Sequence, residues 1–117
     1  QVKGQVHGGV AQGVGQILME QVKYDVESGQ MLTGSFMDYA MPRADHFPSF
    51  STALNEVPSP TNPLGVKAGG EGGTTPAPGV IVNAVIDALR PLGVRDLTMP
   101  LTPLTVWRAI AGKSSKC

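Results

Sequence analysis

Charge is scarce in this chain of 117 residues, of which only 15% are Asp, Glu, Lys or Arg. An average soluble domain has roughly 25%. The nine basic and nine acidic residues cancel. No Lys/Arg cluster provides the positive surface that binds nucleic acid, so we expect no nucleic-acid partner. Because a free-standing domain of this size needs more charge on its surface, the shortage predicts a fragment that other protein covers.

Cysteine and long apolar runs are also lacking. The single cysteine, Cys117, is the last residue, which excludes an internal disulfide, a CxxC pair and a cysteine zinc site. No apolar run approaches the roughly 18 residues of a membrane span. Because the chain begins at Gln1 rather than Met, the lack of a targeting signal carries no conclusion. The hydrophobic content of 41% predicts a folded core. We assign residues 1–112 to one domain and residues 113–117 to a polar, disordered tail.

A glycine-rich loop around a single carboxylate is the most distinctive stretch. Glu71 stands between two glycine pairs and has no ionisable neighbour from residue 68 to residue 86. Glycines leave the backbone without Cβ atoms, so a bulky ligand can approach it closely. The alternative is a solvated glutamate, which is the commoner case for such a loop.

The loop leads into a predicted helix that Pro91 ends. Thr74 or Thr75 can cap the start of this helix, and Pro76 suits its first turn. Apolar residues recur at the helical spacing i, i+3, i+4, i+7 and i+8, and this stripe consists of Ile81, Ala84, Val85, Ala88 and Leu89. One face therefore docks on a core. The docked helix holds the loop where free amides point toward an anionic or electron-rich group.

An earlier helix is predicted for residues 5–20 from apolar residues at helical spacing. It contains several glycines, each of which costs on the order of 1 kcal/mol relative to Ala, so tertiary contacts must hold it together. Gly9 and Gly13 lie four residues apart, where they allow another backbone or a flat ligand to approach. Gln5 and Gln12 share one face, on which they either fix a polar ligand or form a solvated surface.

The middle of the chain predicts short strands. Val22, Tyr24 and Val26 alternate with charged residues as in a half-buried strand, and residues 27–30 form the turn of a hairpin. Residues 51–57 are typical of another short strand. Together with the helices, these strands predict an α+β fold in which helices pack on short, mostly antiparallel strands.

Several familiar chemistries do not fit these residues. A P-loop needs its Lys after the glycines, whereas Lys67 precedes them. No serine lies in a nucleophile elbow, and no second carboxylate stands near Glu71 for glycosidase chemistry. His7 has no second histidine three or four residues away and is expected to be packed or exposed rather than a metal ligand. General base catalysis beside a bound cofactor fits the two features that remain, the single glutamate and the helix rich in Gly and Gln.

The order and spacing of several motifs resemble one family. The motifs are QVHGGVAQGVGQ at residues 5–16, MDYAMPRAD at residues 37–45, NPLGVK at residues 62–67, GE at residues 70–71, PLTP at residues 100–103 and VWRA at residues 106–109. Over nearly the whole chain, to about Gly112, they resemble the C-terminal part of the molybdopterin-binding large subunit of the xanthine dehydrogenase/aldehyde oxidase/carbon monoxide dehydrogenase family.

The resemblance implies molybdenum hydroxylase chemistry. In that family the dithiolene of a pterin holds the molybdenum, usually as the cytosine dinucleotide form in bacterial members, and no protein side chain ligates the metal. Glu71 matches the glutamate that acts as general base and takes a proton from the attacking oxygen. One glycine is displaced, because the family commonly has Lys-Gly-x-Gly-Glu where this chain has Lys-Ala-Gly-Gly-Glu. The residues that match positions around the cofactor are Gln5, Gly8, Gly9, Gln12, Gly13, Lys67, Gly69 and Gly70.

Partners and location follow from the same resemblance. It implies that the remainder of the molybdopterin subunit completes the site and that iron-sulfur and FAD-containing subunits or domains carry electrons away. The substrate is then a small molecule with an electron-poor carbon, such as an aldehyde or an N-heterocycle, and the fragment alone is inactive. The protein is expected in the cytoplasm, with the periplasm as the alternative. A non-catalytic packing domain that retains the fold is the other class of function that these residues allow.

Overall fold

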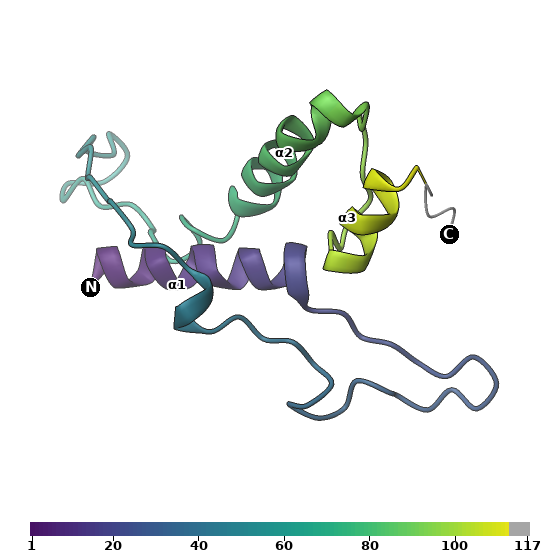
Figure 1. The fold of residues 1–117 in the computed structure, drawn as a ribbon. Helices are drawn as coiled ribbons and strands as arrows, with labels where there is room; N and C mark the ends of the chain where they lie inside the picture. Colours follow the sequence, from purple (N-terminus) through teal and green to yellow (C-terminus); the bar gives the residue numbers. More distant parts are fainter. Residues whose placement is uncertain (113–117) are drawn as a thin grey trace.

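The structure is a computed structural model that describes residues 1–112, so the tail predicted for residues 113–117 lies outside the described residues. Three α-helices organise the chain, and Figure 1 shows α2 rising from the middle of α1 and α3 lying near the C-terminal end of the α1 axis. The helices are α1 (Val2–Val14), α2 (Ala77–Leu89) and α3 (Pro103–Ile110), joined by a π-helical turn η1 (Gly15–Met19) and two 3₁₀ turns, η2 (Ala44–His46) and η3 (Arg90–Leu92). Within the described part of the chain, no helix combines the length and apolar character that a membrane span requires.

The predicted glycine-rich helix is confirmed as α1 together with η1, which continues α1 without a break. Ile17 lies in η1 and is fully buried. The last carbonyl groups of a helix have no partner inside it, and the backbone N–H of Leu101 donates to the Ile17 carbonyl at 2.6 Å. A residue more than eighty positions later in the chain therefore supplies a hydrogen-bond partner to the C-terminal end of the first helix.

The helix predicted after the Glu71 loop is confirmed as α2. No side chain caps α2, whose N-cap position is Pro76, so neither threonine of the loop acts as expected there. The last helix, α3, does have a side-chain cap, because the Thr102 hydroxyl accepts a hydrogen bond from the backbone N–H of Thr105 at 3.3 Å. Gly112 follows this helix with a φ of 70°, a left-handed conformation that ends many helices.

The predicted strands are not found among residues 1–112, where the described structure is helical with extended connections. The hairpin forms as a short ribbon and not as part of a sheet: Tyr24 and Met31 make an isolated antiparallel bridge, and the N–H groups of Asp25 and Leu32 donate to the Gln30 and Lys23 carbonyls, each at 2.8 Å. Its turn uses Gly29 at a φ of 71°, and hydrogen bonds from Ser28 lower the pKa of Asp25. A two-stranded ribbon with no third strand and no helix behind it is only marginally stable in water. The α+β prediction was therefore wrong in its strands, because alternation of residue types does not show that a partner sheet exists.

The described chain is too open to be a self-sufficient domain. Its radius of gyration is 18.0 Å, whereas a compact domain of this length has about 13 Å. Its accessible surface is 9071 Å², whereas a folded monomer of this mass has roughly 6,000 Å². Residues 20–42 extend away from the helices in Figure 1. Part of the additional surface in this segment is apolar, because the side chains of Val26, Phe36 and Met37 are at least 88% exposed. An apolar surface of this extent is typical of a segment that packs against more protein.

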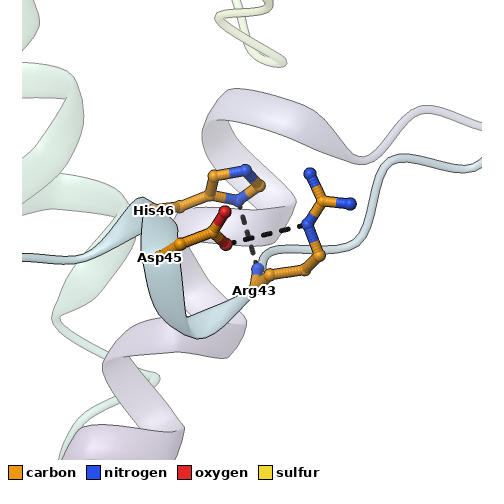
Figure 2. Close-up of polar contacts among 3 residues, drawn as sticks. All are labelled: Arg43, Asp45 and His46. Atoms are coloured by element: carbon orange, nitrogen blue, oxygen red, sulfur yellow. Dashed lines mark hydrogen bonds and ion pairs between the residues drawn. The ribbon is translucent and has the colours of Figure 1, made fainter.

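Residues 43–50 return to α1 and pack on it through aromatic rings. The His7 ring stacks on Phe50 at a centroid distance of 4.7 Å, which confirms the packed histidine. Just before this contact, η2 closes a short polar turn (Figure 2): the Arg43 backbone N–H donates to His46 Nδ1 at 3.1 Å, and Arg43 Nε lies 3.7 Å from Asp45 Oδ1. Because both ends of the Arg43–Asp45 ion pair are exposed, it contributes little to stability. The ring stacking is what fixes this segment on the helix.

A pair of glycine-to-alanine substitutions tests the packing of α2 on α1. A Cβ at Gly13 would lie 2.3 Å from the Cβ of Ala77, so Gly13→Ala is expected to destabilise the fold by about 1–3 kcal/mol, as overpacking does. A Cβ at Gly79 meets nothing within 4 Å, so Gly79→Ala should stabilise α2 by up to about 1 kcal/mol. Thermal and denaturant unfolding of the full-length polypeptide measure both changes. Equal effects of the two substitutions would contradict the close approach of the helices.

Candidate functional site

An open groove forms where the Glu71 loop lies along α1. Its volume is about 430 Å³. One wall comes from a face of α1 whose residues follow each other at helical spacing, and the other wall comes from the loop before α2. The lining residues are Gly4, Gln5, Gly8, Gly9, Gln12, Gly70, Glu71 and Thr74.

Glycine allows the loop to approach the helix this closely. A Cβ at Gly73 would lie 2.5 Å from the Val6 carbonyl oxygen and 2.9 Å from the Val10 nitrogen. A Cβ at Gly9 would lie 2.9 Å from the Thr74 nitrogen. Real Cβ atoms are essentially never found this close to backbone, so the two main chains are in direct contact. Gly9 weakens α1 as an isolated helix, but its missing side chain is one of the features that let the loop lie on that helix.

Two polar contacts link the glutamines of α1 to the loop. Gln5 Nε2 donates to the Gly70 carbonyl oxygen at 2.9 Å, immediately before Glu71. The Thr74 hydroxyl donates to Gln12 Oε1 at 3.5 Å, at the limit of a hydrogen bond. Thr74 thus turns toward α1 and does not cap α2. Each glutamine keeps one amide atom outside these bonds, namely Gln5 Oε1 and Gln12 Nε2.

The Glu71 side chain borders the groove and is exposed. Among the described residues, no Lys, Arg or His forms an ion pair with it. Its backbone is ordered by the turn that follows, in which the Thr75 N–H donates to the Glu71 carbonyl at 3.0 Å. A carboxylate that is free of a cationic partner is able to accept a proton. It lies on the same groove as the two glutamines, although the loop and the helix are far apart in the sequence.

Most of the residues singled out from the sequence meet at this groove, and three do not. Gly13 lies beneath Ala77 and serves the packing of the helices, while Lys67 and Gly69 stand outside the lining. Two further lining residues, Gly4 and Thr74, were not predicted as site residues from the sequence. Gly4 precedes Gly8 by one helical turn, a spacing that places both on one face and that was readable from the sequence. The residues that the structure brings together are Gln5, Gly8, Gly9, Gln12, Gly70 and Glu71.

The groove fits a large, flat and polar organic group. A Cβ at Gly4, Gly8 or Gly70 would meet nothing within 4 Å, so at these positions the walls present bare backbone to open space. Gln5 and Gln12 add uncharged hydrogen-bonding atoms at both ends of the helix face. No group of three or more His, Cys, Asp or Glu side chains within residues 1–112 is arranged to hold a metal ion. These features are compatible with the molybdopterin that the resemblance implies, which brings its own ligands to the metal.

Comparison with known proteins supports the same cofactor. Residues 1–48 match the molybdopterin cofactor-binding domain family. The nicotine 6-hydroxylase large subunit of Paenarthrobacter nicotinovorans is 45% identical over 111 residues, which are 95% of this chain and 14% of that protein. The carbon monoxide dehydrogenase large chain of Hydrogenophaga pseudoflava is 33% identical over 109 residues, which are 93% of this chain and 13% of that protein.

A solved structure shows the same arrangement of the chain. Quinoline 2-oxidoreductase from Pseudomonas putida 86 superimposes with a TM-score of 0.86 at 43% sequence identity, over 94% of this chain and 14% of that one. This chain thus spans about one seventh of the length of the relatives it matches. The open shape, the groove and these likenesses agree, and the chain belongs to the family of molybdopterin-binding large subunits of the xanthine dehydrogenase and carbon monoxide dehydrogenase type.

Proposed function

We propose that this chain is the part of a molybdenum hydroxylase large subunit that supplies the general base and one wall of the pterin cradle. The observation that carries the proposal is the groove in which Glu71, Gln5 and Gln12 meet although they come from separate parts of the sequence. The Gln5 bond to the Gly70 carbonyl ties the carboxylate loop to the cofactor wall. Five of the residues that the resemblance places around the cofactor line this groove together with Glu71, which supports the proposal.

The residues of this chain have three tasks in the proposed reaction. The bound molybdenum–molybdopterin cofactor, in its cytosine dinucleotide form, supplies the two-electron redox chemistry of hydroxylation. The amide atoms Gln5 Oε1 and Gln12 Nε2 would hold it by hydrogen bonds, and the bare backbone at Gly8 and Gly70 would let it approach. Glu71 takes a proton as an oxygen nucleophile adds to an electron-poor carbon of the substrate. No cation neutralises Glu71 within the described residues, so the carboxylate is available as a base.

The proposed substrate is an aldehyde, an N-heterocycle or another small molecule with an electron-poor carbon. The names of the relatives include nicotine and carbon monoxide, so selection among substrates lies in protein outside this chain. The remainder of the large subunit covers the exposed apolar side chains within residues 20–42 and completes the site. Iron-sulfur and FAD-containing subunits accept the electrons, and we propose that the complex works in the cytoplasm. The segment alone is inactive because the groove is open on one side.

Replacement of Glu71 by its amide tests the proposed base. Glu71→Gln keeps the size of the side chain but cannot take up the proton, so kcat should fall by at least the roughly 10²- to 10⁴-fold typical of a lost general base. The assembled enzyme is purified from its host, and its molybdenum and pterin contents should equal those of the wild type. Glu56→Gln, an exposed carboxylate outside the groove, is the matched control and should turn over normally.

Two outcomes would contradict this proposal in different ways. Full turnover of Glu71→Gln with full molybdenum loading would remove Glu71 from the reaction. Absence of pterin and molybdenum from the wild-type assembly would favour a non-catalytic packing domain instead.

Replacement of a groove glutamine tests the cradle. Gln12→Ala removes the amide whose Nε2 faces the cofactor, and a lost hydrogen bond of about 0.5–1.5 kcal/mol should weaken retention of the cofactor roughly 2- to 12-fold. Pterin and molybdenum per subunit after prolonged dialysis measure this loss. Gln16→Ala is the control, because Gln16 is exposed on the same helix outside the groove. Equal cofactor loss in both variants would show that the helix is destabilised and that Gln12 makes no specific contact.

A further inference from the structure

We infer that Gly73 is a positioning residue, which sets Glu71 at a fixed distance from the glutamines of α1 by seating the loop directly on the helix. The inference rests on the proposed role of Glu71 and adds to it the part of the chain that aims the carboxylate. Gly73 does not itself line the groove. It acts only through the backbone that it shares with Glu71, two residues away.

Gly73 is needed for the space at its Cβ position and not for an unusual backbone conformation. Within residues 1–112 the glycines with positive φ are Gly29, Gly65, Gly93 and Gly112, so the backbone at Gly73 is open to any L-residue. The obstacle is steric. A Cβ there would lie 2.5 Å from the Val6 carbonyl oxygen, 2.9 Å from the Val10 nitrogen and 3.2 Å from the Gly9 carbonyl carbon. All three are helix backbone atoms, which no side-chain rotation can move away.

The loop is held on both sides of Glu71. One residue before it, the Gly70 carbonyl accepts the hydrogen bond of 2.9 Å from Gln5 Nε2. Two residues after it, Gly73 rests on the backbone of α1 beside Gly9. The carboxylate therefore stands on a short span whose two ends are both fixed to the helix that carries the cofactor glutamines.

The contact between α1 and the segment that enters α2 continues beyond Gly73, and the paired positions recur at regular intervals. Gln5 meets Gly70, Gly9 meets Gly73 and Thr74, and Gly13 meets Ala77. Steps of four residues along α1 thus correspond to steps of three or four residues along the segment that enters α2. Because this segment turns once before α2 begins, with the Thr75 N–H bonded to the Glu71 carbonyl, a displacement at Gly73 is carried to Glu71 and is not absorbed between them.

Gly73→Ala tests the inference in the assembled enzyme. The new methyl group lifts the loop by about 1 Å, a displacement that costs on the order of 10²-fold in rate when it affects a reacting group. We expect kcat to fall by about that factor while KM and the molybdenum content stay at wild-type values. Hydrogen–deuterium exchange of the peptide that spans residues 69–75 should be faster. The matched control is Gly72→Ala, whose Cβ has only an ordinary contact of 3.6 Å with the Gly69 carbonyl oxygen, and it should retain wild-type kcat.

A double variant separates positioning from a general structural effect. If Gly73 acts through Glu71 alone, Gly73→Ala should cause no further loss of turnover in the Glu71→Gln background. A further loss there, or a parallel loss of molybdenum, would assign Gly73 to structure and overturn the inference. If Gly73→Ala does not fold, Gly9→Ala disturbs the same contact from the helix side, where its Cβ would lie 2.9 Å from the Thr74 nitrogen. Because Gly9 also lines the groove, the turnover of this variant is compared per bound molybdenum and should show the same dependence on Glu71. Additive losses with Gly9→Ala would overturn the inference equally.

The same experiments keep the inference distinct from the proposed function. Full turnover of Glu71→Gln alone would disprove the catalytic base, whatever happens at Gly73. Unchanged exchange of residues 69–75 in Gly73→Ala would disprove the positioning contact even if Glu71→Gln is inactive.

Discussion

Direct contact between two main chains is the constraint on which the rest of the structure depends. The segment from Gly70 to Ala77 lies close against α1, because Gly9, Gly13 and Gly73 have no Cβ at the points of contact. This contact places α2 against α1, opens the groove beside Gln5 and holds the Glu71 loop at its edge. Gly9 and Gly13 each weaken the isolated helix α1 by about 1 kcal/mol, so the sequence sacrifices local helix stability for close packing. Residues that pack the loop on α1, such as Gly9, consequently also line or border the groove.

The buried core is too small to explain this chain as an independent unit. Among the described residues, only Ile17, Ala77, Leu89 and Leu101 are buried apolar side chains. An excess of roughly 3,000 Å² of surface over that of a compact monomer agrees with the scarcity of charge in the sequence. Both observations describe a wall of a larger protein, and the chain spans about one seventh of the relatives that it matches. The open side of the groove is where the remainder of such a protein would complete the site.

The helices and most groove residues were predictable from the sequence, whereas their partners were not. Helical spacing located α1 and α2, and the four-residue interval between Gly9 and Gly13 predicted a close approach. Spacing alone did not distinguish a ligand from protein as the approaching group, and the structure shows loop backbone at Gly9 and the Ala77 methyl group at Gly13. Thr74 was expected to cap α2 and instead bonds to Gln12, because a tertiary partner displaced the local one. The strands failed since alternation at Val22, Tyr24 and Val26 indicates a surface that needs a partner, and not which partner it finds.

The bond between Leu101 and the end of the first helix has a consequence for biosynthesis. Ile17 and Leu101 are the largest fully buried side chains in the described structure, and their backbones are joined at 2.6 Å. During translation, the glycine-rich helix leaves the ribosome long before Leu101 does, and it has little stability alone. Contacts between distant parts of a sequence carry the cost of closing the loop between them. The bond at the end of the first helix can therefore form only once more than eighty further residues have been synthesised after Ile17.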